Sequence, residues 1–179
     1  MSEQDAQESS REGASEADAV TYAEGYDDPN ANVVILALAA KTSLRVHDYY
    51  LKASSPFFLD LLGADTEGGP VPLEGSSDCW RFILDQVIRQ TTCSIANIEL
   101  YAPQNAKDGY WQYLWSMIEL RNLTERYMFA SVSEYLHSEI MDCFKDNPPL
   151  VFAYACGLTP SDGNMAKAAL SASRDRMPG

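Results

Sequence analysis

Several kinds of residue are scarce in this 179-residue chain, and each scarcity excludes a class of function. Basic residues number 13 against 26 acidic ones, so the net charge is −13. Binding to nucleic acid or to an anionic membrane surface needs a basic face, so neither is expected. The longest apolar run, Val33–Ala40, has eight residues, whereas a membrane-spanning helix needs about 20.

Cysteine and histidine are also rare and dispersed. Three of the four cysteines fall within apolar helical patterns, so we expect buried, reduced thiols in a cytosolic or nuclear protein. The two histidines stand 90 positions apart, with no second ligand near either, so neither a metal ion nor a cofactor is expected. Glycine-rich nucleotide loops and the Gly-x-Ser-x-Gly turn of hydrolases are absent. The cysteines are Cys79, Cys93, Cys143 and Cys156, and the histidines are His47 and His137.

Residues 1–31 differ in composition from the rest of the chain. They hold nine acids and a single base, Arg11, and so contribute −8 to the net charge of −13. They lack the basic start and the apolar centre of a signal peptide. Such a composition is typical of a disordered segment, so we expect a disordered acidic tail that either solubilises the chain or binds a partner.

Two strand patterns follow the tail. Asn32–Ala39 is a short, β-branched apolar run, and Ser43–His47 alternates apolar and polar residues. A short turn at 40–42 separates them, which predicts a hairpin. Prolines in the stretch 70–73 indicate a third, short strand at an edge of the sheet.

A helical corner is predicted between the second and third strands. Asp48 is the candidate N-cap of a helix that reaches Ser54. Ser55 is the candidate cap of a second helix, in which Pro56 takes the first position, where its missing N–H costs nothing.

Helices dominate the remainder of the sequence. A capping box at Ser131–Glu134 marks the start of one of them. The stretch from residue 90 to residue 109 reads as loop, with room for one irregular strand at 95–101. A hairpin followed mostly by helices is an α+β pattern, with a short sheet packed against five to seven helices. The helices are expected over 78–89, 110–123, 131–144, 149–157 and 165–173.

Residues that could carry chemistry are few. His47 lies near Ser54 and Ser55, so a small hydrolase that uses this histidine and a nearby serine is one hypothesis. His137 is most simply a surface residue. Scattered acids are usually solvated helix faces, although a paired-carboxylate site among them stays open. These acids are Asp85, Glu119, Glu125, Glu134 and Glu139.

The stretch LRVHDYYLKASSPFFLDLL, which begins at Leu44, resembles the first part of a BTB/POZ domain. In that family a strand ends in a Val-His pair, a helix places Leu four residues after the His, and Ser-x-x-Phe follows. Pro and Phe fill the Ser-x-x-Phe segment as in many fungal members. The matching residues here are Leu44, Val46, His47, Leu51, Ser55, Pro56, Phe57 and Phe58.

Later segments are similar to the same family. ERYMFASVSEYLHSEI (125–140) resembles its closing helix pair, and NPPLVFAYACGL (147–158) resembles the helical extension of fungal members. The resemblance implies a BTB/POZ-like domain over 32–145 and a helical extension with a frayed C-terminus over 146–179.

The resemblance also implies a function. BTB/POZ domains are protein–protein interaction modules, commonly self-associating and without catalysis of their own. The implied partners are proteins, a second copy of the chain or a cullin among them, as in a substrate adaptor of a cullin-type ubiquitin ligase; other members are transcription regulators. No small-molecule substrate is implied. A divergent, truncated family copy without a working partner is a further alternative. Burial of His47 separates the hypotheses, because a catalytic histidine must reach a cleft.

Overall fold

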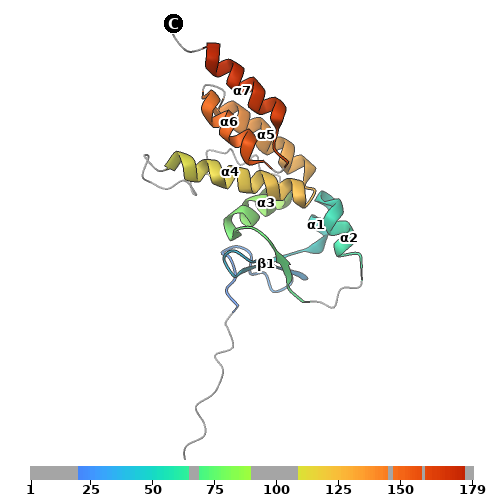
Figure 1. The fold of residues 1–179 in the computed structure, drawn as a ribbon. Coiled ribbons are helices and arrows are strands. Elements are labelled where there is room, and N and C mark those ends of the chain that lie inside the picture. Colours follow the sequence, from blue (N-terminus) through green and yellow to red (C-terminus); the bar gives the residue numbers. More distant parts are fainter. Residues whose placement is uncertain (1–19, 65–68, 90–108, 145–146, 159, 176–179) are drawn as a thin grey trace, which may run out of the picture.

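A computed structural model describes residues 20–64, 69–89, 109–144, 147–158 and 160–175 of the chain. Within these ranges the chain forms one three-stranded sheet and seven helices (Figure 1). The prediction of an α+β fold with a short sheet and five to seven helices is therefore confirmed. The irregular strand expected at 95–101 lies outside the described residues.

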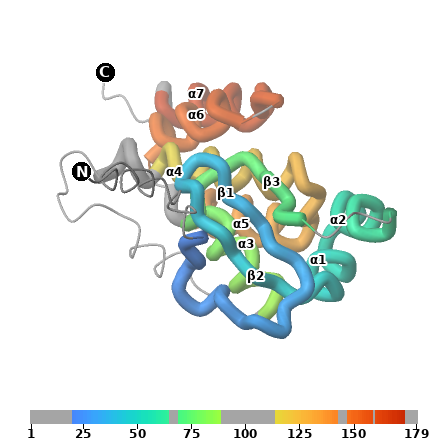
Figure 2. The backbone as a smooth tube through the Cα atoms, turned by 90° about the horizontal axis from the view of Figure 1, so that it is seen from below, coloured from blue at the N-terminus to red at the C-terminus, as the bar shows by residue number. Residues whose placement is uncertain are grey.

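The sheet is built on a hairpin. Strands β1 (Val33–Ala37) and β2 (Thr42–Val46) are antiparallel, and β3 (Val71–Leu73) runs parallel to β1 on its other side, giving the order β2-β1-β3 (Figure 2). Every second residue of β1 is buried, so one face of the strand packs on the core. Strand β1 is shorter than the expected 32–39, because the turn takes residues 38–41, and β2 has the expected five residues but begins one position earlier.

Residues 20–31 are not part of a disordered tail, so the expected boundary at residue 31 is wrong. The backbone around Tyr22 forms a parallel bridge with Ser43 of β2. The N–H of Ala23 donates to the Ser43 carbonyl at 2.9 Å, and Ala23 and Tyr26 are buried. The segment therefore extends the sheet beyond β2, and the acid-rich composition concealed its two core side chains.

The helices stack away from the sheet (Figure 1). Helices α1 and α2 form the corner between β2 and β3, and α3 and α4 separate the sheet from α5, α6 and α7. The C-terminal helices continue the same body, since the Asn122 side chain of α4 donates to the Gly157 carbonyl at the end of α6. The bounds are α1 Asp48–Ser54, α2 Pro56–Leu61, α3 Ser77–Arg89, α4 Gly109–Arg126, α5 Ala130–Phe144, α6 Pro148–Gly157 and α7 Gly163–Asp175.

The predicted helix caps are partly correct. The Ser55 hydroxyl accepts the Phe58 N–H at 3.2 Å, as expected of the N-cap of α2. Asp48 is not the cap of α1, because that helix begins at Asp48 itself and His47 takes the cap position. Ser131 is not a cap either, since α5 begins one residue earlier, at Ala130. A backbone turn starts α5 instead, with Met128 at a φ of 56°.

Aromatic side chains join the corner to the helices. Phe58 of α2 lies 6.3 Å from Trp80 of α3, and Trp80 lies 5.1 Å from Tyr127, measured between ring centroids. Phe129 completes the group, 5.6 Å from Phe58. Trp80 also donates its Nε1–H to the carbonyl of Glu74 at 2.8 Å. This aromatic cluster (Phe58, Trp80, Tyr127, Phe129) fixes the corner relative to α3 and α4.

Candidate functional site

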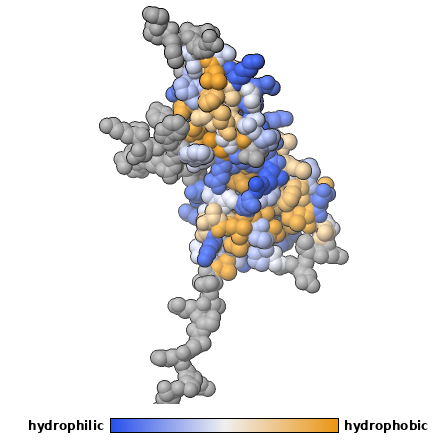
Figure 3. Space-filling view, in the orientation of Figure 1, coloured by the Kyte–Doolittle hydropathy of each residue, from blue (hydrophilic) through white to orange (hydrophobic). Residues whose placement is uncertain are grey.

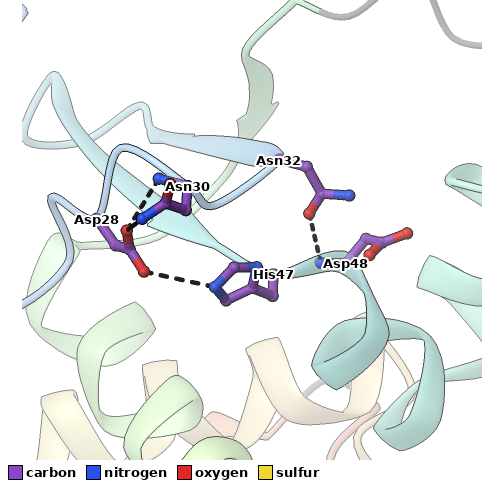
Figure 4. A network of polar contacts seen from close by, with 5 residues as sticks. All are labelled: Asp28, Asn30, Asn32, His47 and Asp48. Carbon is purple, nitrogen blue, oxygen red and sulfur yellow. Dashed lines mark hydrogen bonds and ion pairs between the residues drawn. The ribbon is translucent and has the colours of Figure 1, made fainter.

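His47 connects the last residue of β2 to α1, and its ring faces the N-terminal segment (Figure 4). The Nε2 atom lies 3.4 Å from Oδ2 of Asp28, and the two side chains are 35 % and 50 % exposed. The backbone N–H of Asn30 is the main reason that the pKa of Asp28 is lowered. The His47 side chain is therefore partly exposed and lies beside a carboxylate, whereas the structural hypothesis expects it to be buried or hydrogen-bonded to the backbone.

The start of α1 has polar partners of its own. The Asn32 side-chain oxygen accepts the backbone N–H of Asp48 at 2.9 Å. Lys52, one helical turn later, lies 2.6 Å from the Asp48 carboxylate and is the largest cause of its lowered pKa. Asp28 and Asn32, which both precede β1, thus provide polar partners for the turn in which His47 lies.

The two serines close to His47 in sequence are engaged elsewhere. The hydroxyl of Ser54 donates to the Tyr50 carbonyl in its own helix. The hydroxyl of Ser55 donates to the Tyr127 carbonyl at 2.6 Å, across 72 positions of the chain. A serine nucleophile needs its hydroxyl within hydrogen-bond reach of the base, and both hydroxyls point to backbone carbonyls instead.

The residues of the BTB/POZ-like stretch lie mainly in the core. Pro56 is exposed and Phe57 is half buried, with its ring 5.2 Å from that of Tyr127. Ser55 and the remaining apolar members are buried, with 2 % or less of each residue exposed: Leu44, Val46, Leu51, Ser55 and Phe58.

Three of the scattered acids hold the fold together. Asp85 accepts the Tyr26 hydroxyl at 2.7 Å, which ties the N-terminal segment to α3. Glu119 accepts the backbone N–H of Ser76 at 2.8 Å, just before α3. Glu125 pairs with Arg121 and accepts the Ser133 hydroxyl, which links α4 to α5.

A groove lies between α4 and α5, with a volume of about 510 Å³. Its lining combines charged, polar and apolar side chains, and it places His137 beside two acids. Sequence reasoning missed this site, because the polar positions of α5 read as an ordinary solvated face. The lining residues are Arg121 of α4 and Glu134, His137, Ser138, Met141 and Asp142 of α5.

The expectation of buried thiols is confirmed for Cys79 and wrong for Cys156, which is exposed. Burial raises the pKa of the Cys79 thiol to about 12. Since the thiolate is the reactive form, iodoacetamide at mildly alkaline pH should alkylate Cys156 and leave Cys79 unmodified until the chain unfolds. Peptide mapping by mass spectrometry before and after addition of urea measures this. Equal labelling of the two thiols in the folded chain would contradict the described packing of α3.

In the described residues no three histidine, cysteine or acidic side chains are grouped so that they could hold a metal ion. No helix in the same part of the chain has both the length and the apolar character to cross a membrane. Neither a scan against protein-family models nor a search of the curated proteins finds a match to this chain.

Proposed function

We propose that the chain is a non-enzymatic protein–protein interaction module of the BTB/POZ type. The order of its elements supports this reading: a hairpin, a helical corner, a short third strand and then helices. The side chains of the BTB/POZ-like stretch contribute to the fold. Ser55 and Phe58 tie the corner to the end of α4, where the second similar segment begins.

One observation carries the non-enzymatic part of the proposal. The hydrolase alternative needs a serine that His47 can deprotonate, and the hydroxyls of Ser54 and Ser55 donate to backbone carbonyls. A hydroxyl in such a bond directs its proton to the carbonyl and away from an imidazole. His47 faces the carboxylate of Asp28 instead.

Exposed apolar side chains favour protein binding. On the face drawn in Figure 3, apolar residues gather over α1 and α2. Leu59 of α2 is 53 % exposed and Tyr49 of α1 is 54 % exposed. Apolar residues that gather on one exposed face are more typical of an interaction surface than of an inert one.

A cullin-type ubiquitin ligase is the specific assembly that we propose to test first, with the chain as its substrate adaptor. The test combines two measurements on the full chain. Tagged chain is purified with its bound proteins from the organism it comes from, and binding is repeated with the purified partner. In parallel, hydrolysis of a nitrophenyl ester is compared between wild type and His47→Ala.

We expect a partner that binds directly and no ester hydrolysis that depends on His47. A recovered cullin supports the adaptor role, and a recovered chromatin factor supports a role in transcription; either outcome supports the interaction module. Hydrolysis that His47→Ala abolishes would overturn the proposal in favour of the hydrolase. Failure to recover any directly binding protein would overturn it in favour of a family copy without a working partner.

A further inference from the structure

Three aromatic rings follow one another along the turn from β2 into α1. The ring centroids of His47 and Tyr49 are 5.6 Å apart and the two planes differ by 27°, so these rings are stacked. Tyr50 continues this aromatic row (His47, Tyr49, Tyr50), with its ring centroid 4.1 Å from that of Tyr49. Tyr49 is exposed, whereas the rings of the aromatic cluster are buried. The row therefore leaves a large amphipathic ring within reach of a partner.

The carboxylate of Asp28 lies beside the first ring of this row (Figure 4). A carboxylate can accept about four hydrogen bonds. Asn30 donates two of them to Oδ1, from its backbone N–H at 2.9 Å and from its side-chain amide at 3.1 Å. Oδ2 faces Nε2 of His47 at 3.4 Å, which is longer than a normal hydrogen bond. Since half of the Asp28 side chain is exposed, Oδ2 can accept a further donor from another molecule.

The local charge favours a cation as that donor. Residues 20–31 include three acids and no lysine or arginine, so they contribute −3 to the net charge. Lys52 of α1 is bonded to the Asp48 carboxylate, 2.6 Å away. A partner with positive charge is therefore attracted to the surface beside His47. All three acids of the segment are exposed: Glu24, Asp27 and Asp28.

We propose that the aromatic row and Asp28 together bind an arginine side chain of a partner protein. The guanidinium donates to Oδ2 of Asp28, and the methylene stem packs along the exposed ring of Tyr49. The N-terminal segment already contacts one arginine of the chain in a similar way. The guanidinium of Arg45 lies 4.5 Å from the ring centroid of Tyr22 and donates to its hydroxyl at 3.1 Å. Arginine suits such a surface better than lysine, because its planar group both stacks on rings and donates to carboxylates.

The inference rests on the proposed function, because it names a side chain by which an interaction module would recognise its partner. It is tested with a defined probe, a synthetic peptide of one arginine flanked by two glycines on each side. The matched control peptide has citrulline in place of arginine, which keeps the shape of the side chain and removes its charge. Each peptide is titrated into nitrogen-15-labelled full chain, and backbone amide shifts are followed by NMR.

We expect saturable shifts at the amides of Asp28, His47 and Tyr49 with the arginine peptide, and much weaker shifts with the citrulline peptide. Asp28→Asn removes the charge and keeps an oxygen that can accept from Asn30, so it should weaken binding at least about fivefold. Asp27→Asn removes the same charge from a neighbouring exposed acid. It should change the affinity by less than about twofold.

The contribution of the ring is tested separately at Tyr49. Tyr49→Ala removes the surface along which the arginine stem packs, so it should weaken binding by about threefold or more. Tyr49→Phe keeps the ring and should bind as wild type does. Equal effects of the two variants would contradict a contact between the stem and the ring.

Several results would overturn the arginine site. They are an absence of shifts at these amides, equal binding of the arginine and citrulline peptides, and equal losses in Asp28→Asn and Asp27→Asn. Amide dispersion of each variant, recorded beforehand, confirms that it is folded. Such a failure leaves the interaction module standing, because recovery of a bound partner tests the module by another route. Hydrolysis dependent on His47 would instead remove the module and leave arginine binding as a separate fact.

Discussion

Trp80→Ala is expected to lower the free energy of unfolding by about 3–5 kcal/mol, the cost of emptying a large aromatic site in a core. Trp80 is fully buried and packs against Tyr127 and Phe129, at ring separations of 5.1 and 6.4 Å. The substitution also removes the donor to the Glu74 carbonyl. Urea unfolding followed by far-ultraviolet circular dichroism measures the change without relying on tryptophan fluorescence.

The chain supplies a matched control for this loss. Trp115 is 64 % exposed on α4, so Trp115→Ala should change the unfolding free energy by no more than about 0.5 kcal/mol. If Trp80→Ala does not fold at all, Trp80→Phe keeps most of the ring and should give an intermediate loss. Equal effects of Trp80→Ala and Trp115→Ala would mean that the aromatic cluster does not hold the corner against α3.

Ser55→Ala should cost about 2–4 kcal/mol, because a single hydroxyl makes two bonds at a buried position. It caps α2 by accepting the Phe58 N–H, and it donates to the Tyr127 carbonyl at the end of α4. The first loss weakens a helix start, and the second leaves a buried carbonyl without its donor. The measurement is the same urea transition.

Ser54→Ala is the neighbouring control. The Ser54 hydroxyl bonds back to a carbonyl of its own helix, an interaction that adds little to stability. We therefore expect a change of about 0.5 kcal/mol or less for Ser54→Ala. A similar loss in both variants would show that the link from Ser55 to Tyr127 contributes nothing of its own.

The part of the fold that the sequence predicts well is local. The hairpin follows from alternating residues around a short turn, and the corner follows from Ser55 and Pro56, whose preferences for the N-cap and the first helical position are intrinsic. Residues of the predicted motif, such as Leu51 and Phe58, are buried as apolar periodicity indicates. In each of these cases neighbours in sequence decide the conformation.

What the sequence did not predict depends on distant contacts. The hydroxyl of Tyr26 donates to Asp85, 59 positions later, and this bond ties its segment to α3. The composition of the sequence around residue 26 does not indicate such a bond. The start of α5 depends on Met128 at a positive φ, a conformation that methionine rarely adopts. The α5 groove is equally hidden, because its acids have the same spacing as those of any solvated helix.

The three-stranded order of the sheet bears on how the folded chain behaves at high concentration. Strand β1, whose sequence VVILA has a strong tendency to aggregate, lies in the centre between β2 and β3. On one side the bridge at Tyr22 covers β2 with a very short segment. On the other side lies the three-residue strand β3, in which Pro72 has no backbone N–H to donate to another strand. Short and proline-bearing edges discourage edge-to-edge pairing, so the arrangement protects the folded protein against growth into intermolecular sheets.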